Sequence, residues 1–181
     1  MLIQANNSCL LVVDIQEKLA PAIDDHKTLL ENACWITDIA NRLHIPVLAS
    51  EQYPQGLGET LEPLKQRIPR EQTFAKLAFA CSDDSACDEV LQSLRCEQVI
   101  IIGMEAHVCV LQTALRLQQQ GREVFVVRDC VGSRKPADKD AALERLRDNG
   151  VTLVTREMVA FEWLRKAGDE RFRQISREFL R

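Results

Sequence analysis

A run of β-branched residues that ends at a glycine limits most strongly what this chain can fold into. Residues 99–102 are apolar without alternation, and Gly103 follows them directly. Such a run is typical of a parallel strand that is buried on both faces. The apolar residues after it recur at helical spacing up to Gly121, and a glycine just past the last of them is a common helix stop. The stretch therefore predicts a buried strand, a sharp turn and a helix.

Cys109 stands at or near the first turn of that predicted helix. Unpaired backbone N–H groups and the positive end of the helix dipole meet there. A thiol in such a place tends to have a lowered pKa, which makes Cys109 a candidate nucleophile. The position is equally compatible with a small buried hydrophobe, which is what most free cysteines are.

The rest of the chain alternates between predicted strands and predicted helices. Apolar runs predict further strands at residues 9–13, 46–50, 73–75, 123–128 and 151–155, the first of them central and the fourth ending at Asp129. Helices are expected over residues 27–43, 83–94 and 136–149, a long loop over residues 51–69, and two more helical stretches near the C-terminus. This alternation predicts an α/β fold with helices on both faces of a parallel sheet. Because no repeat or linker interrupts the 181 residues, we expect a single domain over residues 1–181.

Composition excludes several classes of function. The chain is 46% hydrophobic and 28% charged, which is typical of a soluble globular protein. The net charge is −4 and no Lys/Arg cluster dominates, so we expect neither nucleic-acid nor membrane partners. The first apolar run has no basic flank and ends in Asp14, unlike a signal peptide. Seven irregularly spaced cysteines indicate reduced thiols, and we expect a cytoplasmic protein.

Three predicted strand ends carry reactive side chains: Asp14, Lys76 and Cys109. The C-terminal ends of parallel strands lie along one edge of a sheet, so these groups can converge there. A carboxylate can accept the thiol proton, and a nearby ammonium favours the thiolate. Taken singly, each residue has a plain alternative, namely a cap for Asp14, a solvated side chain for Lys76 and core packing for Cys109. Their joint placement favours a site.

The motifs around these residues resemble the isochorismatase-like cysteine hydrolases. The resemblance rests on Val-Asp-Ile-Gln at residues 13–16, Phe-Ala-Lys at residues 74–76 and Gly-Met-Glu-Ala-His-Val-Cys-Val at residues 103–110, and it covers roughly residues 9–163. It implies a Rossmann-like three-layer α/β/α sandwich around a six-stranded parallel sheet. Residues 51–58 are most similar to the small isochorismatase-domain proteins of uncertain substrate.

The resemblance implies a catalytic triad of Asp14, Lys76 and Cys109. Asp14 takes the thiol proton, Cys109 forms a thioester, and the backbone N–H groups of Glu105 and Cys109 hold the oxyanion. Bringing the Glu105 N–H alongside that of Cys109 requires a chain reversal, which the family makes with a cis peptide bond. We therefore expect a cis bond between Met104 and Glu105.

The resemblance also bears on cofactors. The nicotinamidase branch binds a metal through an Asp-x-His pair after the second strand, where this chain reads Ser-Glu-Gln-Tyr at residues 50–53. We therefore expect no metal and no other cofactor. True isochorismatases need no cysteine nucleophile, so Cys109 favours an amide-like C–N bond of a small molecule as the target.

Further site residues carry open alternatives. Gln16 is expected to bind substrate or orient the triad, with a surface position equally compatible. Tyr53 and Phe79 are candidates for lining the pocket, although aromatic side chains more often pack in the core. The rival to an enzyme is a catalytically silent family member that acts as an interaction or thiol-redox protein.

The last predicted helix carries an apolar stripe of Phe172, Ile175 and Phe179. The stripe must pack on the body of the domain or on a second subunit. Because it lies beyond the sheet elements, we expect a homo-oligomer, with docking on its own domain as the alternative.

Overall fold

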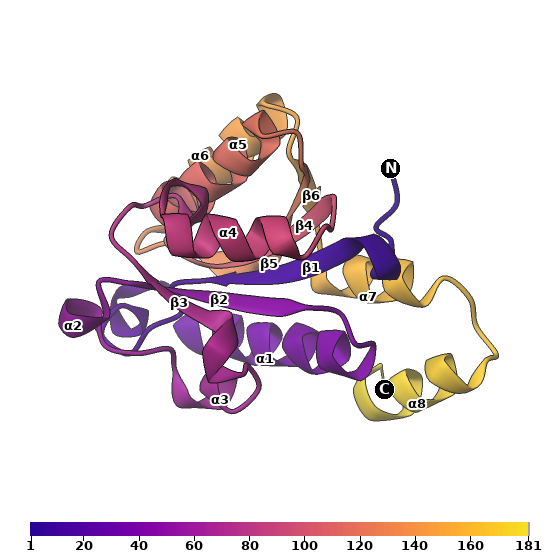
Figure 1. Ribbon diagram of the computed structural model, residues 1–181. Coiled ribbons are helices and arrows are strands. Elements are labelled where there is room, and N and C mark those ends of the chain that lie inside the picture. The colour runs from indigo at the N-terminus through magenta and orange to yellow at the C-terminus, as the bar shows by residue number, and fades with distance from the viewer. Residues whose placement is uncertain (181) are drawn as a thin grey trace.

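A six-stranded, all-parallel sheet forms the centre of the molecule (Figure 1). The computed structural model describes residues 1–180. The strands lie in the order β3-β2-β1-β4-β5-β6. Their bounds are β1 Ser8–Val13, β2 Val47–Gln52, β3 Thr73–Lys76, β4 Gln98–Met104, β5 Glu123–Gly132 and β6 Thr152–Val154. The predicted α/β class and parallel sheet are confirmed.

Helices cover both faces of this sheet, giving the three expected layers (Figure 1). One face is covered by α1 His26–Arg42, α7 Arg156–Leu164 and α8 Glu170–Phe179. The other is covered by α4 Ser85–Ser93, α5 Leu111–Gln119 and α6 Pro136–Asp148. Two short helices, α2 Pro54–Leu57 and α3 Glu62–Lys65, lie in the long connection between β2 and β3.

Strand β1 is central because its side chains serve both cores. Leu10 and Val12 pack into the core beneath α1, whereas Cys9, Leu11 and Val13 pack into the core beneath α4 and α5. A strand buried on both faces needs apolar residues at every position, which accounts for its unbroken apolar run. β1 pairs with β2 on one side and β4 on the other, as the sequence predicted for the first strand.

The turn between β4 and α5 (residues 103–110, called here the β4–α5 turn) differs from the prediction. Residues 1–180 contain no cis peptide bond, so the expected cis bond between Met104 and Glu105 is wrong. The reversal is made instead by Gly103, at φ 148°, and by a π-helical turn, Ala106–Val110, that leads into α5. A Cβ on Gly103 would lie 2.1 Å from the Val13 carbonyl oxygen, so only glycine lets β4 approach the end of β1 this closely.

Two other segments differ from the sequence prediction. The predicted loop at residues 51–69 contains the end of β2, both short helices and an isolated bridge from Gln16 to Thr60. Strand β5 continues past Asp129, because its register against β4 slips by several residues between Val126 and Val131. Such a bulge bends the strand, and a periodicity argument cannot see it.

The apolar stripe of α8 packs on the body of its own domain. Ile175 is buried in the core beneath α1, and Phe172 and Phe179 pack partly buried against the same core. The Trp35 indole N–H donates to the Phe179 carbonyl at 2.9 Å. The alternative of intramolecular docking is therefore the one observed, and the stripe no longer argues for an oligomer.

Within residues 1–180, none of the helices combines the length and the apolar character that crossing a membrane requires.

Candidate active site

A buried ion pair lies at the C-terminal edge of the sheet. Lys76 Nζ is 2.8 Å from Asp14 Oδ2, and both side chains are fully buried. The ammonium also donates to Gln52 Oε1 at 2.6 Å and to the carbonyls of Ala78 and Phe79. The second carboxylate oxygen of Asp14 accepts from Ser50 Oγ at 2.7 Å. Charges buried this deeply persist only when they are paired and hydrogen-bonded, as these are.

Three neighbouring strands bring these groups together. Asp14 follows β1 directly, and Ser50 is paired with the last residue of β1, Val13. Gln52, at the end of β2, is paired with Lys76, at the end of β3. The strand order thus converts residues that are far apart in the sequence into one polar cluster, as the sequence argument expected.

Cys109 completes the cluster from the other side of β1. It is the fourth residue of the π-helical turn, and its residue surface is 4% exposed. Its thiol lies beside the Asp14 carboxylate, close enough for each group to act on the pKa of the other. The structure therefore brings together Asp14, Lys76 and Cys109, the three residues that the sequence singled out.

The electrostatics differ from the expectation of an acidified thiol. Burial raises the pKa of the Cys109 thiol, and the Asp14 carboxylate raises it further, while the Lys76 ammonium only partly opposes them. Burial also raises the pKa of Asp14, against the lowering effects of Lys76 and Ser50. For Lys76, burial lowers the pKa, but Asp14 and the neighbouring thiols more than reverse this, so its pKa is raised. These shifts favour a neutral Cys109 thiol at rest.

Sequence reasoning missed three residues of this cluster. Ser50 and Gln52 are polar residues two positions apart at the end of β2. Their place at the end of a predicted strand could have marked them as candidates for the site. Cys81 is fully buried and hydrogen-bonds to Cys87 and Ser50, and the Lys76 charge acts on it as well. No local pattern marks Cys81, because its place depends on how the chain after β3 folds back.

The three expected substrate-binding residues have different surroundings. Gln16 is fully buried, so the surface alternative is wrong; its side-chain nitrogen donates to the carbonyls of Gln52 and Gly58, and its oxygen accepts from the Gln52 N–H. It therefore braces the connection after β2. Tyr53 and Phe79 are both about half exposed, beside Lys76 rather than in the core: the Tyr53 N–H donates to the Lys76 carbonyl, and the Phe79 carbonyl accepts from Lys76 Nζ.

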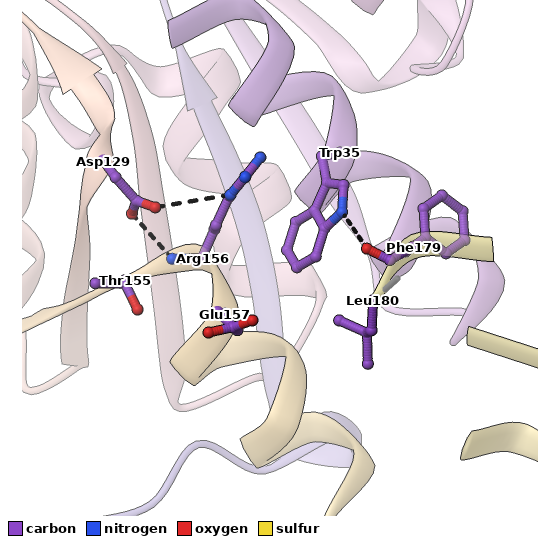
Figure 2. Close-up of a pocket in the computed structure, with 7 residues that line it drawn as sticks. All are labelled: Trp35, Asp129, Thr155, Arg156, Glu157, Phe179 and Leu180. Carbon is purple, nitrogen blue, oxygen red and sulfur yellow. Dashed lines mark hydrogen bonds and ion pairs between the residues drawn. The ribbon is translucent and has the colours of Figure 1, made fainter. Parts of the chain in front are cut away.

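A pocket of about 350 Å³ opens beside the cluster. It is lined by Tyr53, Pro54, Gln55, Ala75, Lys76, Leu77 and Asp84. A larger pocket of about 480 Å³ lies elsewhere, between α1, β5 and the start of α7. Figure 2 shows its Arg156 side chain between the Asp129 carboxylate and the Trp35 ring, with 4.7 Å from the guanidinium carbon to the ring centre. The larger pocket contains none of the three clustered residues, whereas Lys76 lines the smaller one. The smaller pocket is therefore the one that bears on the chemistry of the cluster.

Among residues 1–180, no three His, Cys, Asp or Glu side chains are grouped so that they could hold a metal ion.

Comparison with known proteins identifies the family of the chain. The family model described as the isochorismatase domain matches residues 8–158, which include all three clustered residues. The chain belongs to the isochorismatase family. Members of the isochorismatase family are hydrolases, and the polar cluster lies within the matched domain.

Relatives within the isochorismatase family match most of the chain. Isochorismatase family protein 1A of Dictyostelium discoideum is 33% identical over 94% of this chain and 84% of its own length. Isochorismatase domain-containing protein 2 of Danio rerio is 34% identical over 97% of this chain and 88% of its own length. The secreted isochorismatase effector Isc1 of Phytophthora sojae is 30% identical over 95% of this chain and 84% of its own length.

Solved structures share the fold over the whole chain. The MAR1 ribonuclease of Caenorhabditis elegans superposes with a TM-score of 0.93 at 32% identity, covering 100% of this chain and 93% of that one. YcaC of Pseudomonas aeruginosa, solved with covalent acrylamide, superposes with a TM-score of 0.91 at 26% identity, covering 99% of this chain and 92% of that one. YcaC of Escherichia coli, described as an octameric hydrolase of unknown specificity, superposes with a TM-score of 0.92 at 23% identity, covering 99% of this chain and 91% of that one.

Proposed function

We propose that this protein is a cysteine hydrolase that cleaves an amide-like C–N bond of a small molecule through a thioester on Cys109. The observation that carries the proposal is the placement of the Cys109 thiol beside an Asp14 carboxylate that is itself paired with Lys76. A nucleophile, a base within reach of its proton and a group that orients the base are the parts that nucleophilic catalysis requires.

The proton of Cys109 moves to Asp14 as the sulfur attacks the carbonyl carbon. Because burial holds the thiol neutral at rest, deprotonation accompanies attack rather than preceding it. Lys76, whose Nζ is 2.8 Å from Asp14 Oδ2, favours the ionised form of this carboxyl group against the effect of burial. The C–N bond then breaks, the protonated Asp14 gives its proton to the leaving nitrogen, and water hydrolyses the thioester to regenerate the thiol.

The oxyanion is assigned to backbone N–H groups of the β4–α5 turn. Cys109 lies in the π-helical start of the helical segment, and the first N–H groups of a helix have no partner within the helix. The Glu105 N–H was expected as a second donor only in the cis form, so the proposal now rests on Cys109 for this role.

The substrate is expected to enter the pocket beside Lys76. A volume of about 350 Å³ suits a small molecule, and Tyr53 offers an aromatic wall at its rim. We expect no cofactor in this reaction.

Assembly and location are part of the proposal. The octameric state of the Escherichia coli relative supports a homo-oligomer, although the α8 stripe does not. All seven cysteines are free, which supports a reducing cytoplasm, while the secreted Phytophthora sojae relative shows that location varies within the family.

A ribonuclease activity is the alternative that a relative's name raises. The net charge of −4 and the absence of a dominant Lys/Arg cluster weigh against an RNA substrate. A catalytically silent protein is the other alternative, and the intact Asp14, Lys76 and Cys109 cluster weighs against it.

Alkylation by iodoacetamide tests the proposed chemistry without knowledge of the substrate. The neutral Cys109 thiol passes its proton to Asp14 as the sulfur attacks, although the same carboxylate raises the thiol pKa at rest. We therefore expect Asp14→Asn to slow labelling of Cys109 by about 100-fold or more, because no base then accepts the proton. Peptide mass mapping identifies the labelled site, with Cys109→Ala as the control. An unchanged or faster rate of Cys109 labelling in Asp14→Asn contradicts the proposal, and RNA cleavage that survives in Cys109→Ala favours the alternative.

A further inference from the structure

Two side chains of the β4–α5 turn hold the segment that follows β5. Glu105 Oε1 accepts from Arg134 Nε at 2.5 Å. His107 Nδ1 lies 2.9 Å from Ser133 Oγ. Consecutive residues after β5 thus contact residues two and four positions before Cys109. Side-chain contacts with the segment after β5 therefore hold the β4–α5 turn in place, in addition to the backbone hydrogen bonds of the turn.

Glu105 is an unusual residue to find in this place. Its side chain is only 5% exposed, whereas that of Arg134 is 63% exposed. Within residues 1–180, Glu105 Oε2 accepts no hydrogen bond, and His107 Nδ1 lies 3.5 Å from it. A buried ionised carboxylate destabilises a protein unless it is paired, so the ion pair with Arg134 stabilises Glu105 in this position. A buried, half-satisfied carboxylate calls for an explanation.

The explanation lies in the shape of the turn. Glu105 has φ −26° and ψ 104°, outside the regular regions, and the π-helical turn starts immediately after it. Single π-helical turns are rare and occur mostly at functional sites. The N–H groups of Val108 and Val110, on either side of Cys109, both donate to the Glu105 carbonyl. The orientation of Glu105 therefore sets where Cys109 is held.

We propose that Glu105 is a positioning residue: its buried carboxylate, paired with Arg134, fixes the π-helical turn so that the Cys109 thiol meets Asp14. This inference rests on the proposed function of Cys109 and Asp14. It predicts that Arg134, which touches neither residue of that pair, controls their coupling.

A double-mutant cycle on the iodoacetamide reaction of Cys109 tests this coupling. The four proteins are wild type, Asp14→Asn, Arg134→Gln and the double variant. We expect Arg134→Gln alone to slow labelling of Cys109 by about 10- to 100-fold, because the thiol is displaced from its base. The double variant should react no more slowly than the slower single variant, since both changes remove the same interaction. Arg134→Lys, which keeps the charge, should retain most of the rate.

The matched control is Arg42→Gln, which breaks an exposed pair with Glu178 (2.8 Å) on α1 and α8. It should leave the rate of Cys109 labelling unchanged, and thermal unfolding checks that every variant folds. Additive effects of Asp14→Asn and Arg134→Gln, or no effect of Arg134→Gln, overturn the positioning role and leave the proposed function standing. No effect of Asp14→Asn in the wild-type background overturns the proposed function itself.

Discussion

At the scale of single residues, burial affects the pKa of the Cys109 thiol more than its place at a helix start does. The sequence correctly indicated that Asp14, Lys76 and Cys109 would meet, because strand ends share an edge. It misjudged the Cys109 thiol, whose pKa is raised by burial and by Asp14 rather than lowered. The depth at which a side chain is buried depends on packing from distant segments, so no local pattern could have revealed it.

Lys76→Ala should destabilise the protein as well as inactivate it. The substitution leaves the fully buried Asp14 carboxylate without its cation. We expect the free energy of unfolding to fall by about 3–5 kcal/mol, as for other buried pairs that lose one partner. Urea denaturation measures it, and Lys76→Ala combined with Asp14→Asn should recover part of the loss. A double variant no more stable than Lys76→Ala contradicts the role assigned to the pair.

Turnover should be lost on acidification at a pH above the ordinary Asp14 value of 3.8, because burial raises the pKa of this carboxyl group. Its ionised form, the base, is present only above that raised pKa. The sign for stability is opposite: a carboxyl group with a raised folded pKa opposes folding when ionised, and this penalty is relieved as the pH falls through the folded pKa. A pH–rate profile and unfolding curves over the same range measure both effects. Loss of activity that coincides with unfolding contradicts this assignment.

At the scale of elements, the β4–α5 turn is where the sequence prediction and the structure differ most. The sequence correctly indicated a strand, a glycine turn and a helix. It did not indicate a π-helical turn or the side-chain contacts with the segment after β5, because both depend on which residues lie next to the turn in the folded protein. The bulge in β5 near Asp129 also depends on pairing with a neighbouring strand, so the periodicity of the sequence does not indicate it.

Gly103→Ala should disrupt this turn. The added Cβ would lie 2.1 Å from the Val13 carbonyl oxygen, and the residue sits at φ 148°. We expect the free energy of unfolding to fall by about 3 kcal/mol or more from overpacking and strain together. Gly121→Ala is the matched control, since it has φ 88° but nothing within 4 Å of the new Cβ. Equal losses in the two variants, measured by urea denaturation, would show that close approach to β1 is not what requires Gly103.

At the scale of the whole molecule, the layered fold was predictable and the packing of its C-terminal helix was not. Alternating strands and helices indicate a covered parallel sheet directly. An apolar stripe at the end of a chain indicates only that something covers it. Here α1 does so, and Phe161 of α7 lies beside Phe172.

Ile175→Ala should destabilise the domain without changing its assembly. Ile175 is buried in the core beneath α1, so the free energy of unfolding should fall by about 2–5 kcal/mol. Light scattering at micromolar concentration should give the same oligomeric mass for the variant as for wild type. Dissociation of the variant would mean that α8 contributes to a subunit interface after all.

The proposed reaction passes through a thioester on Cys109 that is formed from an amide. The most direct measurement is a screen of small amides for ammonia release, run in parallel on wild type and Cys109→Ala, with intact mass spectrometry of the rapidly quenched reactions. We predict that an active amide releases ammonia only with wild type and adds its acyl group to the Cys109 peptide. Ammonia release at the wild-type rate by Cys109→Ala would contradict the claim.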